Sequence, residues 1–267
     1  MSETIGRPGD PALPRPLGIG EILSTALQLY RRQWRTLLTI AAVVVVPITL
    51  LHYLVGDLVR TQGETTRNGV VETATWSVGI AGLVAALAGI LMYLVLTGAI
   101  TRAVAAEVAG QDPSVEQSYR FGFHRLGSVL LVSVLVGLAI VGGLILFIIP
   151  GIYIGIRLCV SIEALVVEGR RGTEAMGRSW GLVGGHWWHA FGAVVVGGLL
   201  TGIVNAIITA PFGATGWFVQ AVAAAVATVV TLPYSALVGV LLYLDLRARK
   251  ENLTLDTLRT DLQASAA

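Results

Sequence analysis

Two charged residues, Arg157 and Glu163, lie alone in an apolar stretch of about forty residues that runs from Leu126 to Val167. An ionisable side chain inside a membrane is costly, so it usually has a partner or a function. Six residues apart on one helix, the two side chains do not face each other. Two interpretations stay open for them: a functional or lipid-headgroup role, or a structural pairing or snorkelling toward the membrane surface.

A second group of candidates is basic and lies outside the apolar stretches. Arg178 follows the pair Arg170-Arg171, and Arg247 and Arg249 precede Lys250. Clusters of Arg and Lys next to a membrane bind anionic lipid headgroups. The alternative is that these residues only set the orientation of the chain in the membrane.

The histidines at His186 and His189 have a spacing that can bring two imidazoles together on a helix. No third ligand follows at a useful spacing, and the chain has one cysteine, Cys159. An interfacial Trp/His anchor is therefore the better interpretation of His186-Trp-Trp-His189. The sequence also has no phosphate-binding loop, nucleophile elbow or zinc-protease motif. We expect no catalytic, cofactor-binding or metal-binding residues.

The composition is that of a membrane protein. Of 267 residues, 55% are hydrophobic and 13% charged, and the mean hydropathy is +0.77. Soluble domains have about 25% charged residues. Several apolar stretches reach the length that crosses a bilayer, and the polar segments between them are too short for a separate soluble core.

The apolar stretches predict an all-α integral membrane protein with six transmembrane helices arranged as three hairpins. A charge-free turn at Pro150-Gly151 separates two of the spans. Each hairpin follows an amphipathic segment that we expect to lie in the membrane interface, beginning with 17–35. The three segments align without gaps, which predicts a threefold internal repeat. The predicted spans are 36–55, 77–101, 126–149, 151–167, 190–210 and 217–244.

This pattern divides the chain into three parts. Residues 1–16 are polar and rich in Pro and Gly, and we expect a disordered N-terminal tail. Residues 17–250 form the six-span membrane domain, and residues 251–267 a cytoplasmic C-terminal tail.

The basic residues indicate the orientation. Fifteen of the eighteen Lys and Arg residues fall in one set of alternate segments, two (Arg60 and Arg67) in the other, and Arg157 lies within a span. The positive-inside rule then places both termini in the cytoplasm of a multi-pass plasma-membrane protein.

Three stretches resemble the actinobacterial glycerophosphoryl diester phosphodiesterase membrane-domain family. They are 15–23 with 30–37, the segment from Phe147 to Tyr153 with Arg157, Glu168, Ala175 and 178–183, and Leu242 to Glu251. The resemblance covers Arg15 to about Leu258 and implies the six-span architecture. In some members of that family the membrane domain is attached to a catalytic barrel. This chain lacks the roughly 250 residues of such a barrel, so the resemblance leaves activity open.

The function predicted from these observations is that of a non-enzymatic membrane protein that interacts with lipids or partner proteins. Its expected partners are the lipid bilayer, anionic lipid headgroups or other membrane proteins, without nucleic acid. The oligomeric state stays open. The alternative is a transporter or channel for a small or lipidic substrate, with a cavity lined by Arg157, Glu163 and Asn205. An enzyme acting on lipid phosphodiesters ranks third, because the sequence shows no catalytic set.

Overall fold

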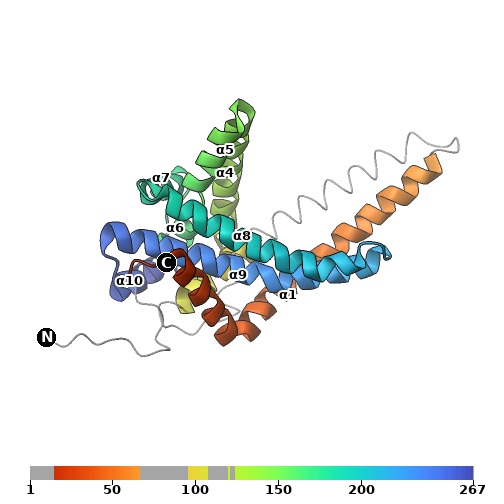
Figure 1. Cartoon of the computed structure of the whole chain (residues 1–267), viewed down its shortest axis with the longest axis horizontal. Coiled ribbons are helices and arrows are strands. Elements are labelled where there is room, and N and C mark those ends of the chain that lie inside the picture. Colours follow the sequence, from red (N-terminus) through yellow and green to blue (C-terminus); the bar gives the residue numbers. More distant parts are fainter. Residues whose placement is uncertain (1–14, 67–95, 108–119, 121–123, 267) are drawn as a thin grey trace.

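The computed structural model describes residues 15–66, 96–107, 120 and 124–266. These residues form helices and no strands, and residues 96–107 are one of the helical segments. Figure 1 shows α8 and α9 side by side, with the α4–α5 pair standing across their direction. The labelled elements are α1 (Ile19–Thr66), α4 (Leu126–Leu146), α5 (Ile148–Arg157), α6 (Ser161–Glu168), α7 (Thr173–Val183), α8 (Trp187–Thr209), η1 (Ala210–Phe212), α9 (Trp217–Glu251) and α10 (Leu255–Ala266).

Five helical stretches among the described residues are long and apolar enough to cross a membrane. They correspond to five of the six predicted spans, so the all-α character and the multi-pass membrane class agree with the sequence. The sixth predicted span, 77–101, lies outside the described residues except for 96–101. So do residues 1–14 of the predicted N-terminal tail. The five stretches are Ile19–Leu54, Leu126–Leu146, Ile148–Glu168, Trp187–Phe212 and Trp217–Glu251.

The first amphipathic segment and the first span form one helix, α1, with a kink at Gln33 (φ −114°, ψ 21°). Before the kink, Ile22 and Ala26 are fully buried, whereas Trp34 just after it is 47% exposed. The segment before the kink packs along α8, because a Cβ placed on Gly192 would meet the Ile19 side chain at 2.6 Å. This part of α1 therefore belongs to the packed core.

The hairpin between α4 and α5 turns three residues earlier than the sequence suggested. The helix breaks at Phe147, whose extended backbone (φ −165°, ψ 156°) separates α4 from α5. Pro150 and Gly151 lie in the first turn of α5, where the missing N–H of proline costs no helical hydrogen bond. The two helices then approach at Gly143 and Gly151, where a Cβ on Gly143 would lie 2.9 Å from the Cα of Gly151.

The predicted fourth span is also interrupted. It consists of α5 and α6, with a break at Leu158–Val160. The buried Ser179 of α7 satisfies two backbone groups at this break. Its Oγ accepts a hydrogen bond from the Val160 N–H (3.3 Å) and donates one to the Arg157 carbonyl (2.9 Å). Backbone groups released by a broken helix need such partners when they are buried. The break turns α6 so that Glu163 faces α9.

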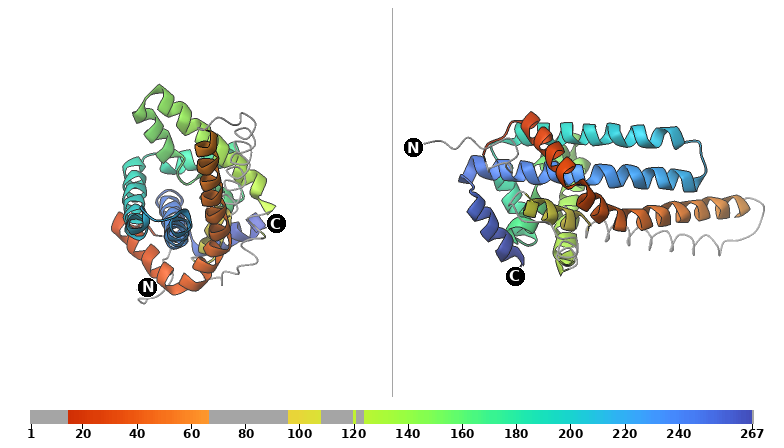
Figure 2. Two further views of the ribbon diagram at one scale, coloured as in Figure 1. Left: turned by 90° about the vertical axis from the view of Figure 1, so that its right-hand side faces the viewer. Right: turned by 90° about the horizontal axis from the view of Figure 1, so that it is seen from below.

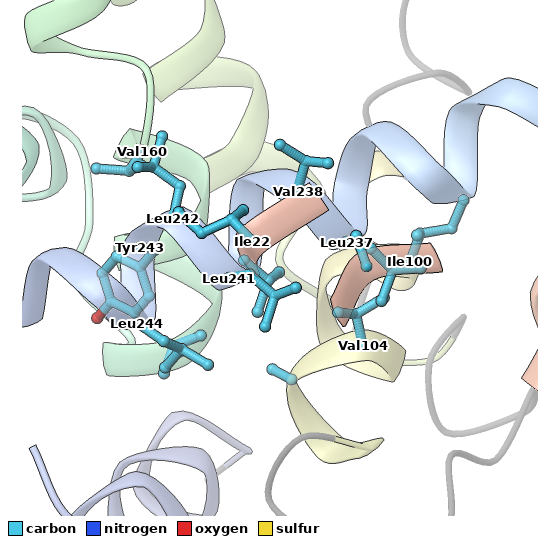
Figure 3. Packing of buried hydrophobic residues seen from close by; sticks show 14 of the residues in the cluster. Ile22, Ile100, Val104, Val160, Leu237, Val238, Leu241, Leu242, Tyr243 and Leu244 are labelled. Carbon is cyan, nitrogen blue, oxygen red and sulfur yellow. The ribbon is translucent and has the colours of Figure 1, made fainter. Parts of the chain in front are cut away.

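The core surrounds the last third of α9, where the residues from Val240 through Ala248 are all buried. Ile22 of α1, Ile100 and Val104 of the 96–107 helix and Val160 pack around this segment, as Figure 3 shows. Burying these apolar side chains stabilises the contact of α9 with the surrounding segments, at about 25 cal/mol per Å² removed from water.

The C-terminal segment is part of the fold and not a separate tail. Residues 255–266 form α10, which packs against α6 and buries Leu258 and Leu262. Two arginines hold its last turn: Arg102 donates to the Leu262 carbonyl (2.8 Å) and Arg125 to the Ser265 carbonyl (2.7 Å). Cations are favourable at a helix C-terminus, where backbone carbonyls lack partners.

The threefold repeat is not confirmed by the described helices. Figure 2 shows α8 and α9 nearly end-on in a view in which α4 and α5 are seen along their length. The two hairpins also turn differently, at a single extended residue in one and through η1 in the other. The second predicted amphipathic segment lies mostly outside the described residues, so the repeat stays a prediction.

The close approach of α4 and α5 leads to a first prediction. Gly143→Ala should lower the apparent melting temperature of the purified protein in detergent, because overpacking typically costs about 1–3 kcal/mol. Gly142→Ala is the matched control: a Cβ there meets nothing within 4 Å outside its own helix, and alanine favours the helix by up to about 1 kcal/mol. Equal melting temperatures for the two variants would contradict the close approach.

Candidate functional site

Charged residues gather where the cytoplasm-facing end predicted for α9 meets α6, α7 and α10. We call the group the Glu168 cluster. It contains the candidate residues Arg178 and Arg247 from the sequence, and it adds carboxylates from three helices. Its members are Glu168, Arg170, Arg178, Tyr243, Arg247, Glu251 and Asp261.

Glu168 is the centre of the cluster. It ends α6, and Gly169 follows in the left-handed conformation (φ 70°) that glycine adopts without strain. The Glu168 carboxylate is 7% exposed and accepts from Arg178 Nε at 2.8 Å and from Arg170 Nε at 2.6 Å. The Tyr243 hydroxyl of α9 donates to the same carboxylate. Glu168 thus joins α6, α7 and α9.

Arg178 also reaches Glu251 with both terminal nitrogens, one of them at 2.6 Å from Oε2. Such a two-point contact is the strongest geometry that arginine forms with a carboxylate. Burial of the guanidinium would lower the pKa of Arg178, but its hydrogen bonds to Glu251 and Glu168 outweigh this and raise the pKa above its ordinary value. Arg178 is therefore a permanent cation that is fully engaged within the protein.

Arg247 connects the cluster to α10. Its side chain is 6% exposed and donates through Nη1 to Asp261 (2.7 Å) and through Nε to Glu251 (3.2 Å). A buried charge is tolerated only when it is paired. Asp261 therefore both satisfies Arg247 and holds α10 against α9.

The cluster surrounds an open polar pocket of about 560 Å³. Four carboxylates and three guanidinium groups face it, so its formal charge is −1. Glu174 is the one of these carboxylates for which the described structure shows no side-chain hydrogen bond or ion pair. The pocket is lined by Glu168, Gly169, Arg170, Glu174, Arg178, Arg247, Glu251 and Asp261.

Arg249, the third basic candidate, belongs to a different group around Asp245. The Asp245 carboxylate has no exposed surface and accepts from the Leu17 N–H (2.6 Å) and from Arg249 Nε (2.9 Å). Arg249 in turn donates to the Leu17 carbonyl (2.6 Å). His189 Nε2 lies 2.9 Å from Asp245 Oδ2 without hydrogen-bond geometry. This group attaches the start of α1 to α9.

Arg157 does not pair with Glu163. Its guanidinium lies over the rings of Tyr153 (5.3 Å) and Trp180 (4.9 Å). It donates to the Tyr153 hydroxyl at 2.8 Å and to the Trp180 carbonyl at 2.9 Å. Cation–π contact and hydrogen bonds together attach α5 to α7. This favours the structural interpretation of Arg157.

Glu163 is 9% exposed and lies against α9, where a Cβ on Gly239 would be 2.5 Å from its Oε1. Its Oε2 is buried without a hydrogen-bond partner. A buried carboxyl oxygen without a partner is costly in free energy. Of the residues singled out within a span, Glu163 is the one that the described contacts do not explain.

Sequence reasoning missed the carboxylates that pair with the candidate arginines. Asp245 with Arg249, and Arg247 with Glu251, are four residues apart on α9. This spacing of opposite charges is a recognised signal for ion pairs on one helix face. The contacts to Glu168 and Asp261 depend on how α6 and α10 pack, and no local pattern indicates them.

No family model, curated protein sequence or solved structure matches the chain. The resemblance to the glycerophosphoryl diester phosphodiesterase membrane-domain family therefore stays a prediction. What can be argued about function comes from the contacts described above.

The cluster leads to a second prediction. Glu168→Gln should destabilise the protein by roughly 1–3 kcal/mol, because Arg170, Arg178 and the Tyr243 hydroxyl lose a buried charged acceptor, although Arg178 keeps its contact with Glu251. The measurement is the apparent melting temperature in detergent. Glu174→Gln is the matched control in the same pocket, and we expect a change within about 0.5 kcal/mol. If the two variants melted alike, Glu168 would not be the centre of the cluster.

Proposed function

We propose that this chain is a non-enzymatic multi-pass membrane protein that organises lipids or partner proteins around a polar base, by which we mean the Glu168 cluster and the group around Asp245. One observation carries the proposal. The basic residues that the sequence offers as candidates for lipid contact or for setting the orientation, Arg178, Arg247 and Arg249, are each paired with carboxylates of the same chain. A set of charges that is fully paired internally is suited to holding helices together and poorly suited to catalysis, which needs groups free to exchange protons or bind substrate.

The surface around the apolar helices supports the membrane part of the proposal. Large apolar side chains on the outer faces of α4, α5 and α8 are exposed, including Leu138, Ile149 and Ile207 at 64–80%. Exposed apolar surface of this extent marks contact with lipid or with another protein. Five apolar helices of sufficient length are compatible with a location in the bilayer.

The finer features of the proposal are six spans, a threefold repeat, a plasma-membrane location and cytoplasmic termini. The support for the orientation is the distribution of Lys and Arg along the chain. The contacts at the Glu168 cluster also support it. The ends of α6 and α9 meet there with the side chain of Asp261 from α10. The predicted spans 151–167 and 217–244 therefore both end at this cluster, on the basic side.

A transporter or channel is the alternative. Its support is the buried carboxyl of Glu163, since an ionisable group within a span often lies on a transport path. The expected cavity would be lined by Arg157, Glu163 and Asn205, yet none of the three lines the polar pocket or the apolar groove between α1, α8 and α9. Arg157 is held by two aromatic rings. We therefore place transport second.

The orientation gives a third prediction, testable by labelling single cysteines in a Cys159→Ser background. Ala214→Cys, in the exposed turn between α8 and α9, should react with a membrane-impermeant maleimide in intact cells. Gln263→Cys, on the exposed face of α10, should react only after the cells are lysed. Labelling of Gln263→Cys in intact cells would contradict the proposed orientation.

The proposed role is tested by co-purification from native membranes in polymer discs. We expect lipids or membrane proteins enriched relative to the bulk membrane. A protein that is released by alkaline carbonate, or whose associated lipids and proteins match the bulk composition, would contradict the proposal.

A further inference from the structure

Arg157 differs from the other candidate arginines because it has no acidic partner. Arg178, Arg247 and Arg249 are each paired with carboxylates of the same chain. In the part of the chain that the structure describes, Arg157 forms no ion pair and contacts two aromatic rings, one hydroxyl and one carbonyl instead. Its positive charge is therefore not balanced by a described carboxylate.

The contacts of Arg157 leave part of its guanidinium for another acceptor. A guanidinium carries five N–H donors. Nε and Nη2 donate to the Tyr153 hydroxyl at 2.9 and 2.8 Å, and Nη1 donates to the Trp180 carbonyl at 2.9 Å. One N–H remains on each terminal nitrogen, and the side chain is partly exposed. Planar N–H groups of this kind suit the oxygens of a phosphate.

The guanidinium is held in place by three helices. A Cβ on Gly184, directly after α7, would lie 2.8 Å from Arg157 Nη1, so the charge approaches the backbone closely there. The Tyr153 ring stacks on Trp187 of α8 at 5.8 Å, and Trp187 Nε1 donates to the Tyr153 carbonyl (3.3 Å). Because the cation is already fixed, a ligand need not order it on binding.

The neighbours of Arg157 indicate its level in the membrane. Trp187 is the first residue of one of the stretches that could cross a bilayer, and Trp180 lies outside all five of them. Lys250, near the end of α9, donates to the Gly181 carbonyl beside Trp180 (2.5 Å). Arg157 itself is the last residue of α5. This combination of Trp, Arg and Lys at helix ends is typical of the headgroup level.

Apolar surface continues from Arg157 along α5. Ile149 and Tyr153 precede Arg157 by eight and four residues, so the three lie along one face of this helix. Ile149 is 80% exposed and Tyr153 39%. Trp188 of the neighbouring α8 is 77% exposed. The surface thus presents a cation followed by hydrocarbon, which matches the phosphate and acyl chains of a phospholipid.

We propose that Arg157 binds the phosphate of an anionic membrane lipid whose acyl chains lie along the exposed apolar face of α5. The inference rests on the proposed membrane function and names the ligand class for it. Tyr153, Trp180 and Gly184 are positioning residues for the guanidinium. An anionic headgroup is favoured over a zwitterionic one, because no described carboxylate contacts Arg157 to receive an ammonium group. A soluble phosphate compound would leave the apolar face of α5 unused.

The test uses the full chain, reconstituted into vesicles with equal amounts of phosphatidylglycerol and phosphatidylcholine, then repurified and analysed for retained lipid. The wild-type protein should retain phosphatidylglycerol preferentially. Arg157→Gln should lose about fivefold of this preference, as expected for one cation near the membrane surface. Gly184→Ala should change it in the same direction, because the added methyl group displaces the guanidinium.

Two control variants make the result specific. Arg259→Gln removes an exposed cation on α10, and Gly181→Ala adds a methyl group to α7 where a Cβ meets nothing within 4 Å. Both should behave as the wild type. Equal preferences for Arg157→Gln and Arg259→Gln, or for Gly184→Ala and Gly181→Ala, would overturn the proposal.

A second measurement keeps the proposal testable if Arg157→Gln fails to fold. Phosphatidylglycerol with a diazirine in its headgroup should crosslink the wild-type protein at peptides of α5, α7 and the start of α8. Crosslinks spread evenly over the chain would overturn the proposal. Excess glycerol phosphate should not displace the retained lipid, and displacement would overturn the lipid as the source of the phosphate.

Failure of this inference can be told apart from failure of the proposed function. Wild-type protein that resists carbonate extraction yet retains the two lipids equally would defeat this inference alone. Release of the protein by carbonate would defeat the proposed function itself.

Discussion

Two opposite charges on the buried end of α9, Asp245 and Arg247, constrain the rest of this structure. Neither side chain can be left unpaired, because an isolated charge away from water costs far more free energy than a folded domain's net stability. Their partners come from distant parts of the chain. The Asp245 carboxylate accepts a hydrogen bond from the Leu17 N–H at the start of α1, and Arg247 donates to Asp261 of α10. Beside them, Glu168 of α6 pairs with Arg178 of α7, which also pairs with Glu251 of α9.

This arrangement explains why the chain combines two different surfaces. Outside the polar base, apolar side chains of α4, α5 and α8 stay exposed and suit lipid. At the base, the helices are joined by charge pairs and by a collar of Leu, Val and Ile. A buried ion pair is weak evidence for added stability, but it forms only when both side chains are placed with good hydrogen-bond geometry. In this protein they determine which helix ends lie together. Arg157 lies apart from these pairs, held by Tyr153 and Trp180 with no carboxylate partner among the described residues.

Much of the architecture could be predicted from hydropathy, because crossing a bilayer demands about 20 apolar residues and the pattern shows them directly. The details that depend on packing could not. Pro150-Gly151 suggested the turn, yet the chain breaks at Phe147, since proline is acceptable in the first turn of a helix. The sequence offers Arg178 and Arg247 as candidate residues, but their partners Glu168 of α6 and Asp261 of α10 depend on tertiary contacts that no local spacing reveals. The 251–267 segment was too polar to predict as packed, although Leu258 and Leu262 of α10 have no exposed surface.

The central claim is that the paired charges at the end of α9 hold the helices together and do not serve as free ligand sites. The most direct measurement is a double-mutant cycle between Arg178 and Glu251, with Arg178→Gln, Glu251→Gln and the double variant, read as apparent stability in detergent. Contacting charges in one network should show a coupling of about 0.5–3 kcal/mol, so that the double variant loses less than the sum of the single losses. Additive losses with no coupling would contradict the account.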